Sequence, residues 1–135
     1  NYESTSDVLA QCNLIDIGDL CYSKLRPYLD KAFIASFDAI STTELLVYDT
    51  KLASKQYVLY HLHSKPFIHY VSGKGFGTKM PRVNHEIIGK YDVKVLENEK
   101  QVLDKMSEFE RAKKALSEKI RSSKMLYKSI LNQVF

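Results

Sequence analysis

The sequence predicts an α+β fold in which N-terminal helices precede a small antiparallel β-sheet, and a long C-terminal α-helix follows it. Three observations support this prediction. In the first 40 positions, apolar residues recur at steps of three and four, as in an amphipathic helix. Between positions 43 and 71 the chain carries short runs rich in Val, Tyr and Phe, which favour strands. Residues 98–135 contain neither Pro nor Gly, so no helix-breaking residue interrupts them.

Two helical segments are expected in the N-terminal third. Ser6 and Asp7 are typical of a helix start, and the apolar positions that follow indicate a helix that Gly18 weakens or ends. The second segment, 20–40, contains Pro27. It is expected either to kink there or to begin near that residue, where the missing N–H costs little.

The middle of the chain is expected to form the sheet. Strands are predicted at 43–48, 56–63, 67–71 and roughly 91–96. The residues between the second and third of these, Ser64-Lys65-Pro66, have the length of a hairpin loop. A helix over 54–63 is the alternative, because Ser54 would cap it and Pro66 would follow its end. The Tyr and Val content of this segment favours the strand.

The C-terminal segment predicts a helix capped by Asn98, with an apolar stripe that only Lys113 and Ser123 interrupt. At about 1.5 Å per residue it would be roughly 55 Å long. A body of fewer than a hundred residues is on the order of 30–35 Å across. We therefore expect a body (1–97) and a helix (98–135) that either bends at Ser122-Ser123 to cover its own sheet or buries its stripe on a partner. The residues predicted to form this protein interface are Val102, Met106, Phe109, Leu116, Ile120, Tyr127 and Ile130.

The composition excludes some classes of protein. It is 44% hydrophobic and 27% charged, which is ordinary for a globular chain, and no apolar run approaches the roughly 18 residues of a membrane span. Cys12 and Cys21 are too few for a disulfide scaffold, which indicates buried thiols in a reducing, intracellular compartment (cytoplasmic or nuclear). The net charge of +4 is uneven, because residues 51–92 hold seven Lys and Arg against two Asp and Glu.

The Gly-rich segment 72–82 is a candidate nucleic-acid contact. Its alternating glycines fit neither the P-loop nor the dinucleotide-binding pattern. In a loop, Lys74, Lys79 and Arg82 would bind phosphates and Phe76 would stack on a base. The alternative is a plain connection between strands.

Three histidines form a weaker candidate site. If 56–63 and 67–71 pair as a hairpin, His61, His63 and His69 share one face, as an open three-histidine zinc site requires. A shift of one residue in register destroys the match. The alternative is that they are half-exposed strand residues.

The sequence holds no recognised pattern for nucleophilic catalysis, and no cofactor is expected. The leading prediction is a non-enzymatic interaction module that self-associates through its C-terminal helix or binds a helical protein partner. A nucleic-acid-binding domain that uses 72–82 is the alternative, and a metal-dependent enzyme is third.

Overall fold

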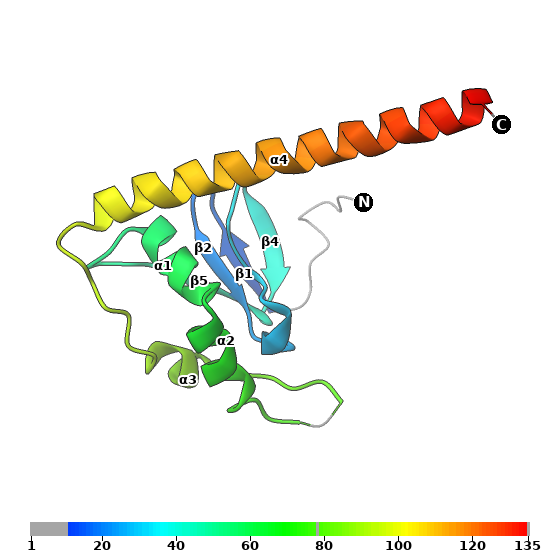
Figure 1. Ribbon diagram of the computed structural model, residues 1–135. Coiled ribbons are helices and arrows are strands. Elements are labelled where there is room, and N and C mark those ends of the chain that lie inside the picture. Colours follow the sequence, from blue (N-terminus) through cyan, green and yellow to red (C-terminus); the bar gives the residue numbers. More distant parts are fainter. Residues whose placement is uncertain (1–10, 78, 135) are drawn as a thin grey trace. The chain divides into compact units, whose positions relative to one another are not determined.

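The computed structural model describes residues 11–77 and 79–134, and it confirms the α+β class (Figure 1). The chain divides into two compact units, residues 1–96 and 97–135. The first unit holds the strands and three short helices, and the second holds the long helix.

Five short strands form two antiparallel sheets in the first unit. They are β1 (Cys12–Ile15), β2 (Leu20–Ser23), β3 (Ala32–Ile34), β4 (Ala39–Thr42) and β5 (Leu45–Tyr48). β2 lies between β3 and β5 in a three-stranded sheet, and β1 pairs with β4 in a ribbon. The prediction of a strand over 43–48 is confirmed, although it begins two residues later.

The predicted helices of the N-terminal third are wrong wherever the structure describes them, because its regular elements are strands apart from one short 3-10 helix. The helix start proposed at Ser6 and Asp7 lies outside the described residues. β2 shows the physical reason. Leu20 and Tyr22 face one core and Cys21 faces another, and none of the three is more than 1% exposed. A strand buried on both faces has no alternation of apolar and polar residues by which to recognise it.

The turns between these strands use left-handed backbone. Gly18, at a φ of 89°, lies in the turn between β1 and β2, which the Asp19 N–H closes by donating to the Asp16 carbonyl (3.0 Å). Pro27 begins a short 3-10 helix, η2 (Pro27–Leu29), rather than a kink in a long helix. Arg26 and Asp30 flank η2 with positive φ, so the chain turns sharply on both sides of it.

Three short helices follow the strands, each capped by a side chain. They are α1 (Lys55–Leu62), α2 (Lys65–Ser72) and α3 (His85–Gly89). The N-cap side chains of Ser54, Ser64 and Asn84 each accept a hydrogen bond from the backbone N–H three residues on. The predicted strands over 56–63 and 67–71 are therefore wrong, and the helical alternative over 54–63 is the one observed. Pro66 lies in the first turn of α2, where a missing N–H leaves no hydrogen bond unmade.

The main core lies between the three-stranded sheet and the helices. Phe67 is at its centre, with its ring edge-to-face with those of Tyr22 (centroids 5.6 Å apart) and Tyr91 (5.0 Å). The fully buried members of this core are Leu20, Tyr22, Phe67, Val71 and Val83. A smaller core between the sheet and the β1–β4 ribbon contains Ile15, Cys21 and Ala35.

The segment after α3 packs on the helices without forming the strand predicted at 91–96. The Tyr57 hydroxyl donates to the Lys94 carbonyl in this segment (2.8 Å), and the Tyr70 hydroxyl donates to the Ile87 carbonyl in α3 just before it (3.1 Å). The Tyr91 ring lies edge-to-face with that of Phe67 and is tilted against that of Tyr70. Aromatic side chains of α1 and α2 thus hold this segment in place of a backbone ladder.

The second unit is one helix, α4 (Glu99–Val134), of 36 residues (Figure 1). It runs unbroken through Ser122 and Ser123, so the predicted bend is absent. At about 1.5 Å per residue its length is about 54 Å. No helix in the described part of the chain is both long and apolar enough to cross a membrane.

Candidate nucleic-acid and assembly surfaces

The Gly-rich segment forms a loop between α2 and α3, and its second half is bound to the end of β2. Phe76 and Arg82 exchange two backbone hydrogen bonds of 2.8 Å. On its other side, the backbone of Arg82 forms an antiparallel β-bridge with Leu25. The Arg26 N–H donates to the Pro81 carbonyl (2.7 Å), and the Val83 N–H donates to the Lys24 carbonyl (3.1 Å). The loop is therefore held by a short antiparallel ladder.

Two glycines permit this arrangement. Gly77 has a φ of 96°, which non-glycine residues rarely adopt. A Cβ on Gly75 would lie 3.3 Å from the Pro81 Cβ, so a side chain there would push the two arms of the loop apart. The glycines serve the tight turn itself, and no phosphate cradle is needed to explain them.

The loop presents an aromatic ring and basic side chains to solvent. Phe76 is 67% exposed. Lys79 is exposed as well, and Lys74 places its Nζ 4.0 Å from the centroid of the Tyr70 ring. An exposed aromatic ring among cations is the arrangement by which single-stranded nucleic acids are bound.

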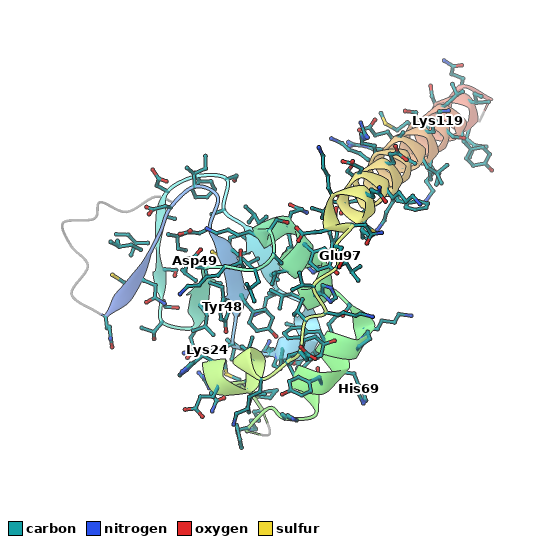
Figure 2. The ribbon with its side chains drawn as sticks, turned by 90° about the vertical axis from the view of Figure 1, so that its left-hand side faces the viewer. Lys24, Tyr48, Asp49, His69, Glu97 and Lys119 are labelled. Atoms are coloured by element: carbon teal, nitrogen blue, oxygen red, sulfur yellow. The ribbon has the colours of Figure 1, made fainter. Side chains whose placement is uncertain are left out.

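Arg82 differs from Lys74 and Lys79 because it is paired with a carboxylate. Its Nε donates to both carboxylate oxygens of Glu44, at 3.1 and 3.2 Å. Glu44 lies in the turn between β4 and β5, and its carbonyl accepts from the Lys24 N–H (2.9 Å). The four predicted contact residues therefore share one loop, and the fold adds Lys24, Arg26 and Glu44 beside it (Figure 2 labels Lys24). The sequence did not predict these three residues, because the hydrogen bonds that bring them together join distant parts of the chain. They also depend on β2, which lies in a segment that was predicted to be helical.

The three histidines do not form the predicted cluster. His61 lies in α1 against the Tyr57 ring (centroids 4.8 Å apart). His63 caps the C-terminus of α1 and bonds through Nδ1 to Asp30 (2.8 Å). His69 lies on the exposed side of α2 (Figure 2). The hairpin that would have aligned them is wrong, and nowhere in 11–77 or 79–134 do three His, Cys, Asp or Glu side chains gather to hold a metal ion.

A cavity of about 150 Å³ lies between the sheet and α3, next to the main core. Tyr48 and Asp49, which Figure 2 labels, line it together with mostly apolar neighbours. The hydroxyls of Tyr22 and Tyr48 are buried, and neither has a hydrogen-bond partner among the residues that the structure describes. Burial raises the pKa of Tyr48 to about 12 and raises that of Tyr22 as well. Both hydroxyls therefore stay neutral at physiological pH, which suits a packing role better than acid–base chemistry.

The two cysteines are both free. Cys21 is fully buried, and burial raises the pKa of its thiol, which makes it a poor nucleophile. Cys12 is half-buried on β1. The prediction of buried thiols thus holds fully for Cys21 and only partly for Cys12.

The apolar stripe of α4 is largely exposed. Phe109, Leu116 and Tyr127 are each at least 60% exposed, and Ile120 and Ile130 are about half exposed. Met106 is 36% exposed, and Val102 is half-buried. Met125, Leu126 and Leu131 add further exposed apolar surface near the C-terminus. A contiguous apolar surface of this kind is typical of a protein interface.

A scan of the chain against known protein families finds no matching family, and a search of curated proteins finds no relative.

Proposed function

We propose that this protein is a non-enzymatic assembly module that self-associates through α4. The single observation that carries the proposal is the exposed apolar stripe along a 36-residue helix. Helices rarely keep such a stripe in water, because most of the stability of a helix comes from burying its apolar face. A second copy of the chain supplies an apolar stripe of equal length, and no other protein has to be assumed.

The spacing of the stripe fits a coiled coil. With Met106, Ile120 and Tyr127 at a positions and Phe109, Leu116 and Ile130 at d positions, the apolar residues occupy the heptad seam. Lys113 falls at an a position and Ser123 at a d position. In a parallel dimer Lys113 would face its own copy in the core, and Lys119 would face Lys124 beside it.

An antiparallel pair removes both of these contacts and leaves one like-charge contact, between Lys119 and Lys119 of the second copy. When Leu116 lies opposite Ile120 of the second copy, the same register places Lys113 opposite Ser123 and Glu110 beside Lys124. The two polar interruptions then meet each other. Lys124 exchanges a like-charged neighbour for an oppositely charged one, which makes two attractions per dimer against the single contact of Lys119 with its own copy. Leu131 lies beside Leu103 of the second copy, which gives the broad C-terminal apolar face a role. We therefore propose the antiparallel arrangement.

Sedimentation velocity of the purified chain at micromolar concentration tests self-association. We expect a dimer or larger species, and we expect Leu116→Asp combined with Ile120→Asp to produce monomer by placing charges in the seam. The matched control is Ala115→Asp with Ser122→Asp, which adds the same charge at outward positions and should leave the assembly intact. A wild-type chain that sediments as a folded monomer would refute the proposal.

A second function, nucleic-acid binding by the first unit, is favoured by the exposed Phe76 between Lys74 and Lys79 on a braced loop. The surrounding segment 51–92 carries a net positive charge. Phosphate contacts by such side chains make affinity fall steeply with salt.

Fluorescence anisotropy with labelled single- and double-stranded oligonucleotides over a salt series tests this second function. Replacing Lys74, Lys79 and Arg82 with Ala should flatten the log–log salt dependence by about three units. Replacing Lys51, Lys90 and Lys94 with Ala removes the same charge at exposed positions outside residues 72–82 and is the control. Absence of binding at low salt, or equal effects of the two triple variants, contradicts a role for the loop.

The proposed location is intracellular. Its support is that both thiols are free, as is usual in a reducing compartment. Non-reducing electrophoresis of the protein taken directly from cells should show no intermolecular disulfide, and a disulfide-linked dimer would count against this location.

A further inference from the structure

The contact between Glu44 and Arg82 joins two turns that are 38 residues apart in the sequence. Both carboxylate oxygens of Glu44 accept from the single Nε–H of Arg82. The side chains are 36% and 52% exposed, respectively. An ion pair this exposed typically contributes no more than about 1 kcal/mol to folding, so stability alone is a weak reason for its geometry.

Both side chains project from backbone that is fixed by the same ladder. Arg82 is bridged to Phe76 and Leu25, and the Glu44 carbonyl accepts from the Lys24 N–H at 2.9 Å. The β4–β5 turn and the Gly-rich loop are therefore both fastened to residues 24–26. The backbone positions from which the Glu44 and Arg82 side chains project are thus held at a set place relative to each other.

The contact uses only one of the five N–H donors of the guanidinium. Within the described residues, every side-chain hydrogen bond of Arg82 runs from Nε, which leaves the four Nη–H donors. Two parallel Nη–H bonds are the arrangement in which arginine binds a phosphate, and fixing the side chain beforehand reduces the entropy lost on binding.

We propose that Glu44 is a positioning residue that holds Arg82 by Nε so that its Nη edge receives a phosphate of a bound nucleic acid. This inference rests on the proposed nucleic-acid binding by the loop. Electrostatics alone makes the opposite prediction. A carboxylate near a phosphate repels it, so removal of the carboxylate would strengthen binding. The sign of the effect therefore separates positioning from simple repulsion.

The experiment measures the affinity of the full chain for a labelled oligonucleotide by fluorescence anisotropy at two or more salt concentrations. Glu44→Ala removes the acceptor and the charge, whereas Glu44→Gln removes the charge but keeps an oxygen for Nε. Asp92→Ala removes an exposed carboxylate elsewhere in the first unit and is the matched control. Thermal melts of each variant establish that it is folded.

We expect Glu44→Ala to weaken binding by roughly three- to tenfold, as for contacting residues in one network. Glu44→Gln should bind at least as well as wild type, and Asp92→Ala should not weaken binding. In an Arg82→Ala background, Glu44→Ala should have no further weakening effect, because the side chain it positions is gone. A merely structural role for Glu44 would persist in that background.

Arg82→Lys gives a second measurement that does not depend on position 44. Lysine keeps the positive charge but lacks the two parallel Nη–H donors of the guanidinium. We therefore expect weaker binding of the oligonucleotide with an unchanged salt slope. If Glu44→Ala strengthens binding as much as Asp92→Ala, or if Arg82→Lys binds like wild type, positioning by Glu44 is refuted while loop binding stands. If wild type does not bind at low salt, the proposed nucleic-acid function itself fails.

Discussion

At the scale of single residues, the packing of the first unit depends most on Phe67. It is 1% exposed and touches the rings of Tyr22 and Tyr91. We expect Phe67→Ala to lower the free energy of unfolding by about 3–5 kcal/mol, because it removes buried surface and leaves a cavity. Phe37 is 58% exposed, so Phe37→Ala should change the free energy of unfolding by less than about 0.5 kcal/mol. Urea denaturation measures both, and similar losses for the two variants would contradict this account of the core.

Asp19 gives the fold a dependence on pH. Its carboxylate accepts from the Asp16 N–H (2.9 Å) and from Lys55 Nζ (3.0 Å), and these bonds lower the pKa of Asp19 below its ordinary value. A carboxylate with a lowered pKa stabilises the folded state above the unfolded pKa of about 3.9. That stabilisation disappears as the pH falls through the folded pKa.

The corresponding prediction concerns Asp19→Asn, which keeps the size of the side chain and removes the charge. We expect it to melt at a lower temperature than wild type at about pH 6, and we expect the difference to shrink as the pH falls below about 4. Asp92→Asn, at an exposed position, is the control. A difference between wild type and Asp19→Asn that stays constant from neutral to acidic pH would show that the charge is not what stabilises the fold.

At the scale of elements, the sequence indicated the fold class and the long helix correctly but reversed the order of strands and helices in the body. In α1, Tyr57 and Tyr60 favour a strand by local preference. The segment is nevertheless a helix, with Leu62 in the main core and Val58 packed against it, because packing outweighs a weak β-propensity. Ser54 and Ser64 are the correct local signals, since each caps a helix. Pro66 is compatible with a hairpin loop and with the first turn of a helix. The burial of Phe67 in the main core selects the helix.

The cap of α2 is therefore a testable element. The Ser64 hydroxyl accepts from the Phe67 N–H at 3.3 Å, at the residue that anchors the core. We expect Ser64→Ala to destabilise the protein by about 0.5–2 kcal/mol and Ser64→Gly to cost only a few tenths, because Gly is a tolerated N-cap. Ser72→Ala, at the exposed other end of α2, should be close to neutral. The free energy of unfolding in urea is the measurement, and equal effects at positions 64 and 72 would argue against the cap.

At the scale of the whole molecule, the candidate surfaces were predictable to different degrees. The stripe of α4 is local information, because helical spacing places Phe109 and Leu116 on one face whatever the rest of the chain does. The basic loop was also visible, because glycines and Pro81 mark a turn. The Glu44 contact with Arg82 was not predictable, since it requires the pairing of β5 with β2, and β2 lies in a segment that was predicted to be helical. Long-range pairing is the information that a single sequence conveys least.

The orientation of two α4 helices in the assembled molecule can be determined from one charge reversal. In the antiparallel arrangement Lys124 lies beside Glu110 of the second copy, so Lys124→Glu replaces two symmetric attractions with repulsions. Dimerisation should then weaken by about 1–2 kcal/mol, or roughly tenfold in Kd. In the parallel arrangement Lys124 lies beside Lys119, so the same change would strengthen the dimer.

Glu110→Lys combined with Lys124→Glu restores the attraction only in the antiparallel pair. Sedimentation equilibrium of wild type, the single variant and the double variant at low salt provides the three constants needed. Recovery in the double variant supports the antiparallel arrangement. A single variant that dimerises more tightly than wild type would exclude it while leaving self-association through α4 in place, because the apolar seam is common to both orientations.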